Sequence, residues 1–320
     1  MKNKILFQLI IVLFLMACTS SQQDKTTKPS CGDGICQTLE SSGKIPCSED
    51  CGTSNESSKS SLIKDISYGT DSSAQKLDLY LPKNFSGKIP LIIEIHGGGF
   101  EAGDKYPSQY AEILVSQGYA VTSLNYRLSG ESIFPAAVYD VKSAVRWLRA
   151  NADEYNLDPD NFGSIGGSAG GYFSAFLAVT GDTSEFDIGD NLGYSSKIQA
   201  AVDLFGPVNF SGLNEQRITS GFKTNNVEEK YLGCTTLSCE TVMIASPVNY
   251  INKGDTQILI VHGDKDTKIP IQQSKDFYNL LQNAGVESTF VIAEGLGHGG
   301  PGYSERYSND FIEFFNKHLK

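Results

Sequence analysis

The sequence predicts an α/β fold with a mostly parallel sheet of about eight strands and helices packed against its faces. Two observations favour this class. First, eight short runs of mainly apolar residues have the length and composition of strands. They lie at 63–68, 76–81, 91–96, 119–124, 162–167, 200–205, 257–262 and 288–293. Second, from the third run onward the intervening segments are long enough for a crossover helix, which parallel pairing requires.

The first two runs lie too close together for a crossover, so we expect them to pair antiparallel. Helices are expected at 107–117, 135–150, 170–180, 270–284 and 304–318. The clearest is 135–150, because Val138, Val141 and Val145 recur at three- and four-residue spacing and Pro135 suits a first turn. Ligands of such a sheet bind outside the carboxyl ends of the parallel strands, so functional residues are expected there.

The N-terminal residues read as a targeting segment and a tether. Residues 1–17 have two lysines before an apolar stretch too short to span a membrane comfortably, which is typical of a signal peptide. The segment ends in Leu-Met-Ala before Cys18, which resembles a bacterial lipobox with lipid attached to Cys18. An ordinary signal peptide with an incidental cysteine is the alternative. Export to the bacterial cell envelope, with a lipid anchor in the membrane, is therefore expected.

Residues 18–61 are expected to form a flexible tether that contains a cysteine-rich segment at 31–52, and the globular domain spans 62–320. Six cysteines remain after Cys18. They are Cys31, Cys36, Cys47, Cys51, Cys234 and Cys239. An even number in an exported chain predicts disulfides. The first four could instead bind zinc, and acidic residues near them could hold calcium, but neither spacing matches a known metal motif. No metal site and no cofactor are expected.

The charge of the chain argues against one class of partner. Its formal net charge is −11, and we find no cluster of lysine and arginine in the predicted domain. Nucleic-acid binding through a basic surface is therefore not expected.

The strongest chemical motif is G-x-S-x-G at 166–170, between a predicted strand and a predicted helix. Small residues on both sides of such a sharp turn let the strand and the helix approach each other. The turn then holds Ser168 out at the edge of the sheet, where a base can reach it. A single serine between glycines is more often an ordinary turn residue, so its significance depends on its partners.

Partners for a serine nucleophile follow other predicted strands. His96-Gly97-Gly98-Gly99 offers backbone N–H groups for an oxyanion hole. Asp264 and Asp266 follow the seventh strand, and His298 lies in a glycine-rich loop after the eighth. Each element alone could be a plain loop, but together they give the chain order serine, acid, histidine. His96 and His262 lie at strand ends and are expected to orient loops, and His318 is expected at the surface.

We expect irregular structure over the segment 207–250, which lies between the sixth strand and the strand that precedes Asp266. It contains several aromatic residues and the Cys234/Cys239 pair. One interpretation is a small lid that shapes an apolar pocket. The other is a structural connection with an ordinary aromatic core.

Taken together, residues 62–320 resemble the α/β-hydrolase esterases of the BD-FAE and hormone-sensitive-lipase groups. The matching segments are 76–82, 96–105, 125–128, 134–148, 166–171, 245–247, 262–266 and 297–298. The resemblance implies an α/β-hydrolase fold with Ser168 as nucleophile, Asp266 as triad acid and His298 as base. It also implies an oxyanion hole of Gly98, Gly99 and the N–H of Ala169. One departure is Gly167, where relatives often carry Asp or Glu.

The resemblance further implies a serine esterase that acts without a cofactor on short-chain or aromatic esters, such as acetyl or feruloyl groups of polysaccharides. Arg127 and Asp140 belong to the matching pattern and are expected to form a structural pair. Three alternatives stay open: amide or formamide hydrolysis, peptide hydrolysis of the prolyl-oligopeptidase type, and a non-catalytic binding protein on the same fold.

Overall fold

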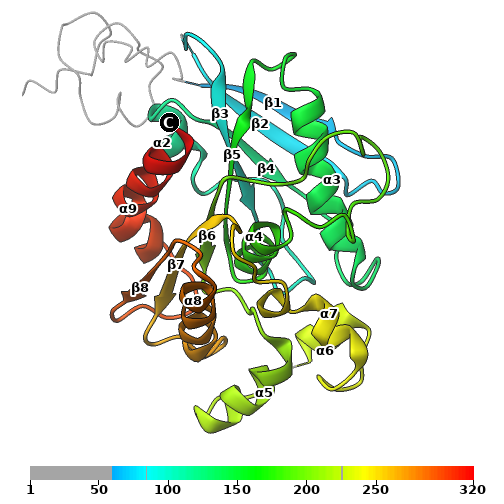
Figure 1. Cartoon of the computed structure of the whole chain (residues 1–320), viewed down its shortest axis with the longest axis vertical. Helices are drawn as coiled ribbons and strands as arrows, with labels where there is room; N and C mark the ends of the chain where they lie inside the picture. The colour runs from blue at the N-terminus through cyan, green and yellow to red at the C-terminus, as the bar shows by residue number, and fades with distance from the viewer. Residues whose placement is uncertain (1–59, 84, 225) are drawn as a thin grey trace, which may run out of the picture. The chain divides into compact units, whose positions relative to one another are not determined.

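An eight-stranded sheet lies at the centre of the computed structural model, which describes residues 60–83, 85–224 and 226–320 (Figure 1). Its strands are β1 (Ser60–Ser67), β2 (Lys76–Pro82), β3 (Ile89–Ile95), β4 (Ala120–Leu124), β5 (Leu157–Gly167), β6 (Ala200–Leu204), β7 (Gln257–Gly263) and β8 (Ser288–Ala293). Their order across the sheet is β1-β2-β4-β3-β5-β6-β7-β8. The signal peptide, the lipidation of Cys18 and the disulfides of the first four cysteines concern residues 1–59, which lie outside the described residues, and stay predictions.

The strand directions follow the prediction. β1 pairs antiparallel with β2, and β2 pairs antiparallel with β4. Every other neighbouring pair is parallel. The predicted α/β class with a mostly parallel sheet is therefore confirmed. The carboxyl ends of β3 to β8 consequently meet at one edge of the sheet, which is where the candidate functional residues lie.

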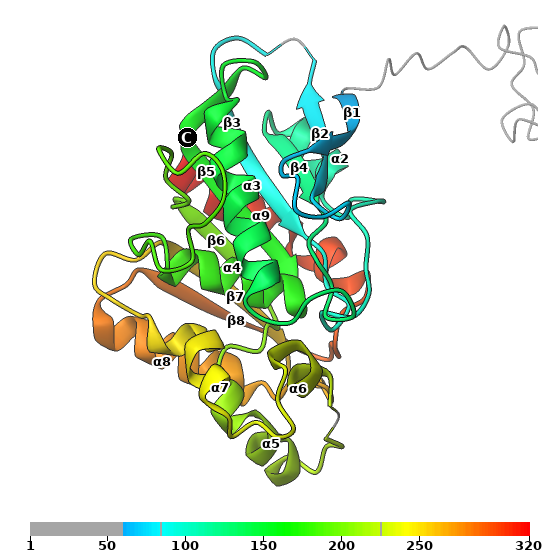
Figure 2. The same ribbon diagram turned by 90° about the vertical axis from the view of Figure 1, so that its right-hand side faces the viewer.

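Helices cover both faces of the sheet (Figures 1 and 2). α3 (Ala136–Ala150), α4 (Ala169–Val179) and α8 (Gln272–Ala284) share one apolar core with one face, and α2 (Ala111–Ser116) and α9 (Gly302–Leu319) share a second core with the other. Every residue of α4 is buried, in agreement with its continuously apolar sequence. Within the described ranges, no helix combines the length and the apolar composition needed to cross a membrane.

The helix expected at 107–117 is shorter than predicted, because α2 begins only at Ala111. Glu94 lies near the end of β3 and is buried. Its carboxylate accepts hydrogen bonds from the hydroxyl of Ser108 and from the N–H of Gln109, the latter at 2.7 Å. These bonds hold residues 108–109 as part of a loop that leads into α2. The predicted start of this helix was wrong.

The segment 207–250 is helical rather than irregular. It contains α5 (Phe210–Thr219), α6 (Val227–Leu232), α7 (Glu240–Ala245) and a 3₁₀ turn (Pro247–Asn249). A disulfide joins Cys234 and Cys239 between α6 and α7. The prediction of irregular structure was wrong because helices of six to ten residues are too short to show a clear apolar period.

The aromatic residues of this segment belong to the core. Tyr231 stacks on Phe100 with ring centroids 4.0 Å apart, and Phe210 packs against Tyr172 at 5.4 Å. All four side chains are buried. The interpretation as an aromatic core is therefore correct for these residues, and they do not shape an apolar pocket.

The turn from β5 into α4 depends on close backbone contact. Ser168 has φ 58° and ψ −118°, a backbone conformation that residues other than glycine rarely adopt. A Cβ on Gly170 would lie 2.0 Å from the carbonyl oxygen of Ile95 in β3, and one on Gly166 would lie 2.4 Å from the carbonyl carbon of Gly170. Only glycine allows α4 to begin this close to β3.

A buried carboxylate holds the neighbouring turn, which follows β6. Asp203 is fully buried, and its Oδ1 accepts the N–H of Gly206 at 2.8 Å. Its Oδ2 has no hydrogen-bond partner among the described residues. Burial raises the pKa of Asp203 to about 6, although the N–H of Gly206 and the nearby His262 act in the opposite direction.

We expect Gly170→Ala to lower the free energy of unfolding by at least about 3 kcal/mol, because the added methyl group meets a backbone carbonyl that has no room to move. Gly193→Ala is the matched control, since a Cβ at Gly193 would meet nothing within 4 Å. Its expected effect is within about 0.5 kcal/mol. Urea unfolding of the three proteins measures both values, and equal effects of the two substitutions would contradict this account.

We expect Asp203→Asn to change the pH dependence of stability. The raised pKa means that the folded protein keeps the Asp203 proton between about pH 4 and pH 6 while the unfolded chain loses it. The wild type therefore loses stability as the pH rises through this window, by about 3 kcal/mol relative to Asp203→Asn. Urea unfolding of both proteins at pH 4, 5, 6 and 7 tests this. Parallel curves would show that Asp203 does not titrate there.

Candidate active site

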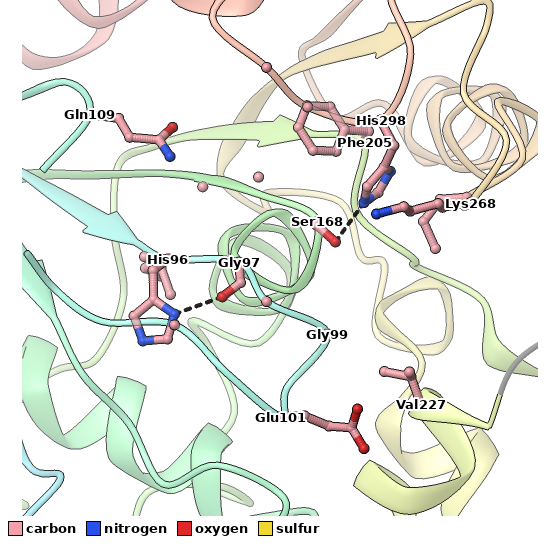
Figure 3. Close-up of a pocket in the computed structure, with 18 of the residues that line it drawn as sticks. His96, Gly97, Gly99, Glu101, Gln109, Ser168, Phe205, Val227, Lys268 and His298 are labelled. Atoms are coloured by element: carbon pink, nitrogen blue, oxygen red, sulfur yellow. Dashed lines mark hydrogen bonds between the residues drawn. The ribbon is translucent and has the colours of Figure 1, made fainter. Parts of the chain in front are cut away.

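Ser168, His298 and Asp266 form a continuous hydrogen-bonded chain at the carboxyl edge of the sheet. Figure 3 shows its bond between Ser168 and His298. The Nε2 of His298 lies 2.9 Å from the Oγ of Ser168, and its Nδ1 lies 2.7 Å from the Oδ2 of Asp266. Because a carboxylate only accepts hydrogen bonds, Nδ1 carries the proton and Nε2 is free to accept from the serine hydroxyl. The structure thus brings together the three residues predicted from their order in the chain.

Asp266 receives hydrogen bonds on both of its oxygens. Its Oδ1 accepts the N–H groups of Lys268 at 2.8 Å and Ile269 at 3.0 Å, and its Oδ2 accepts from His298. Burial alone would raise the pKa of Asp266, but hydrogen bonds from His262 and His298 outweigh it and hold the pKa below its usual range. Asp266 therefore stays ionised next to the imidazole of His298.

His262 has a closer connection to the site than the sequence suggested. It is fully buried at the end of β7, and its Nε2 lies 3.2 Å from the Oδ2 of Asp266 and 3.0 Å from the carbonyl oxygen of Ile269. Its Nδ1 lies 2.7 Å from the Oγ of Ser274. Since both neighbours of Nε2 accept, Nε2 donates and Nδ1 accepts from the serine. His262 orients a loop as expected, and that loop carries Asp266.

The second candidate acid, Asp264, lies apart from this chain. Its Oδ1 accepts the N–H of Gly295 at 2.6 Å, and its Oδ2 pairs with Lys265. Asp264 therefore links the acid loop to the loop that carries His298, while only Asp266 contacts the imidazole.

The glycine loop after β3 lies beside Ser168. Gly98 has φ +116° and Gly99 has φ +61°. A Cβ on Gly98 would lie 1.9 Å from the carbonyl oxygen of Ala102, so the turn requires glycine there. Among the described residues, no protein acceptor is bonded to the N–H groups of Gly98, Gly99 or Ala169. These are the three groups predicted to form an oxyanion hole.

Two rings fix the loops on either side of Ser168. His96 donates from Nδ1 to the carbonyl of Gly97 at 2.8 Å (Figure 3). It also stacks on Tyr126 with ring centroids 4.5 Å apart. Burial lowers the pKa of His96, which favours its neutral form. On the other side, Phe205 packs against His298 with centroids 4.9 Å apart. The glycine loop and the base are thereby both held by packed rings.

Ser168 and His298 open into a cavity of about 980 Å³. One wall comes from the loop 104–110, and the opposite wall comes from the segment 217–228 together with 267–269. The second wall carries charged and polar side chains, among them Arg217, Glu228 and Lys268. Residues of the segment 207–250 thus line the cavity, while its aromatic residues Phe210 and Tyr231 pack into the core and not against the cavity.

A buried ion pair joins this second wall to the acid loop. Arg217 of α5 contacts both carboxylate oxygens of Glu228 of α6, at 2.9 and 2.7 Å. The Nε of Arg217 donates to the carbonyl of Lys268 at 3.0 Å. Both charged side chains are at most 5% exposed. The helices over the cavity are thus fastened to the turn that carries Asp266.

The predicted pair Arg127 and Asp140 also forms, with Nη2 to Oδ1 at 2.6 Å. Arg127 donates from Nε to the same carboxylate at 2.8 Å. The pair joins the loop after β4 to α3 and lies outside the cavity. His318, expected at the surface, is only 10% exposed and packs on Phe314. In the part of the chain that the structure describes, no three His, Cys, Asp or Glu side chains are arranged to hold a metal ion.

Curated proteins similar to this chain are mostly esterases. The chain is 29% identical over 245 residues to "Probable carboxylic ester hydrolase LipM" of Mycobacterium tuberculosis, which covers 72% of this chain and 54% of that protein. It is 26% identical over 282 residues to "Uncharacterized peptidase YuxL" of Bacillus subtilis, covering 81% of this chain and 39% of that protein. The chain spans about half the length of the curated relatives it matches most strongly.

Solved structures give a closer match over the full domain. A "Truncated form of carbohydrate esterase from gut microbiota" is 34% identical with a TM-score of 0.75, covering 82% of this chain and 97% of that one. A "Bifunctional GH43-CE" of Bacteroides eggerthii is 28% identical with a TM-score of 0.74, covering 81% of this chain and 35% of that one. These matches confirm the α/β-hydrolase fold.

The family model described as BD-FAE matches residues 77–281, which hold the glycine loop, Ser168 and Asp266. The match covers more than half of the chain. The chain therefore belongs to the BD-FAE family, and its domain is a hydrolase of the carboxylesterase type.

Proposed function

We propose that the domain is a serine ester hydrolase that works through an acyl-enzyme. It acts on short-chain or aromatic acyl groups esterified to carbohydrate. The observation that carries this proposal is the chain of hydrogen bonds from Ser168 through His298 to Asp266. Beside it lie three backbone N–H groups to which no described residue is bonded. This arrangement supplies a nucleophile, a base, a group that fixes the base, and donors for a developing oxyanion.

The chemistry follows from these positions. The Oγ of Ser168 attacks the ester carbonyl carbon while the Nε2 of His298 takes its proton. The N–H groups of Gly98, Gly99 and Ala169 stabilise the negative charge on the carbonyl oxygen, each by roughly 3 kcal/mol. The imidazolium then gives its proton to the leaving alcohol oxygen. Water attacks the acyl-enzyme by the same route in reverse and releases the acid.

Asp266 keeps its negative charge throughout, because its pKa lies below its usual range. An ionised acid fixes the Nδ1–H tautomer of His298 and stabilises the imidazolium that forms in each half-reaction. No metal or organic cofactor takes part in this scheme.

Two features support a carbohydrate ester as substrate. The solved structure with 34% identity, which this chain spans almost completely, is titled a carbohydrate esterase. The cavity of about 980 Å³ is at the upper end of the range for small-ligand sites, so it has room for much more than an acetyl or feruloyl group. We further propose that the domain meets polysaccharide outside the cytoplasm, tethered through lipid on Cys18. This last part rests on the N-terminal sequence.

Peptide hydrolysis is the second candidate, and one similarity favours it. The relative from Bacillus subtilis that matches 81% of this chain is named a peptidase. This chain spans only 39% of that protein. A peptidase and an esterase share the same catalytic groups, so direct comparison of substrates is needed to separate them.

We expect Ser168→Ala to lower kcat/KM for p-nitrophenyl acetate and methyl ferulate by roughly 10⁴-fold or more, because the nucleophile is lost. A fluorophosphonate probe should label the wild type and not the variant. Ser184→Ala, at an exposed serine outside the cavity, is the control and should match the wild type. Wild-type turnover by Ser168→Ala would contradict the proposal. Cleavage of a peptide anilide with both esters inert would favour the peptidase instead.

We expect substitution of His262 to lower kcat more than it changes KM, because His262 contacts Asp266 and lies outside the cavity lining. In His262→Phe both hydrogen bonds of Nε2 are lost, and misplacement of the acid should cost about 10- to 100-fold in kcat. His262→Gln keeps a donor and should retain more activity. Steady-state kinetics at equal folded fraction, checked by thermal unfolding, measure this. Equal kcat in the two variants would reduce His262 to a packing role.

A further inference from the structure

One wall of the cavity has no part in the proposed chemistry. Asp104, Tyr106, Pro107, Gln109 and Tyr110 line the same cavity as Ser168 and His298. The attack on the ester needs only the triad and the backbone donors, so this wall is free to contact some other part of a substrate. Figure 3 shows the Gln109 side chain directed into the cavity.

Tyr106 is the most unusual residue of this wall. The residue is 55% exposed, although it lines a cavity and is large and aromatic. The Nζ of Lys64 lies 4.2 Å from the centroid of its ring, so one face of the ring is already covered. More than half of the residue nevertheless stays accessible to solvent. An aromatic face held in water beside an active site is available for a flat, partly apolar ligand.

The loop that carries Tyr106 is held in place by buried groups. The backbone N–H of Tyr106 donates to the Oδ1 of Asp104 at 2.9 Å. The neighbouring Lys105 is buried and reaches Asp78 at 2.8 Å, and the buried Glu94 accepts the N–H of Gln109 at 2.7 Å. A ring on such a loop loses little freedom when a ligand binds, which favours recognition.

The wall also contacts the helix that follows the loop of the base. Tyr110 packs edge-on against Phe311 of α9, with ring centroids 5.9 Å apart. Gly299 and Gly300 of the His298 loop and Tyr303 of α9 line the cavity as well. His298 is the group that hands a proton to the leaving alcohol, so the wall and the base border the same space.

A pyranose ring fits this combination of groups. It has a flat C–H face that can lie on an aromatic ring, and hydroxyls on its edge that bond to planar polar side chains such as those of Asp104 and Gln109. Sites for small ligands combine apolar surface with a few placed polar groups in this way. We propose that Tyr106 is the platform of a subsite that binds a sugar ring of the alcohol part of the substrate, next to the sugar that carries the acyl group. This inference rests on the proposed esterase function and adds the residue that selects a glycan over a simple alcohol.

The test compares Tyr106→Ala and Tyr106→Phe with the wild type on two kinds of acetate ester. One is p-nitrophenyl acetate, which has no sugar. The other is a set of mono-acetylated β-1,4-linked xylo- and cello-oligosaccharides with two to six rings. In Tyr106→Ala the KM for the acetylated oligosaccharides, which all have a ring next to the acetylated one, should rise about 3- to 10-fold, with kcat little changed. Tyr106→Phe keeps the ring and should stay close to the wild type.

Two controls separate this effect from general damage. Turnover of p-nitrophenyl acetate should be the same in all three proteins. Tyr194→Ala removes another exposed tyrosine, 45% exposed and outside the cavity, and should leave every substrate unchanged.

Several outcomes would overturn the inference. These are equal KM values for the wild type and Tyr106→Ala on both oligosaccharide series, or no hydrolysis of any acetylated oligosaccharide by a wild type that cleaves p-nitrophenyl acetate. If Tyr106→Ala lowers the turnover of methyl ferulate and of no other substrate, the ring contacts the acyl part of the ester. That result would also overturn the inference. Failure of the wild type on every ester, p-nitrophenyl acetate included, would instead refute the proposed esterase function.

Discussion

The close approach between the start of α4 and the end of β3 is the constraint on which the site depends. Gly170 lies so near the carbonyl of Ile95 that no side chain fits between them. This contact sets the position of Ser168 at the top of its turn, with an uncommon φ of 58°. It also brings the glycine loop that follows β3 next to the serine. The nucleophile and its oxyanion donors are thus placed by one backbone contact rather than by two independent loops.

The base and the acid depend on a second set of contacts, centred on the carboxylate of Asp266. Four donors surround it, two from its own turn and two from imidazoles. Their combined effect outweighs burial and keeps the group charged. Since the turn is also bonded to His262 from the sheet and to Arg217 from α5, its shape is fixed from two directions. A charge held in this way needs little reorganisation when the neighbouring imidazole becomes protonated.

Much of this arrangement could be predicted from the sequence, because the relevant signals are local. The apolar runs in the sequence predicted the eight strands, and the lengths of the segments between the runs predicted which strands pair parallel. Glycines around Ser168 and after β3 marked places where backbone must approach backbone. The structure brings Ser168, Asp266 and His298 together as their chain order suggested, and their roles in catalysis remain part of the proposal.

What the sequence could not give depends on contacts between distant residues. Glu94 bonds to the loop before α2, fifteen residues away, and nothing in the local pattern shows this contact. The helices at 210–245 are too short for a period to appear, and their aromatic residues look the same whether they face a pocket or a core. The contact of His262 with Asp266 joins residues only four positions apart. A histidine near the end of an apolar strand, four positions before the predicted acid, was the signal from which this contact could have been predicted.

The Arg217 bridge has a consequence for how specificity can change in this domain. Arg217 belongs to the wall that faces the substrate, yet it is bonded to the carbonyl two residues after the triad acid. A remodelled α5–α6 segment that drops this arginine would release the acid turn as well as reshape the wall. New specificities therefore arise most readily from exchange of side chains at positions such as Lys223 and Thr224, which line the cavity without anchoring it. In chimaeras, the segment and the acid turn should be inherited from the same parent.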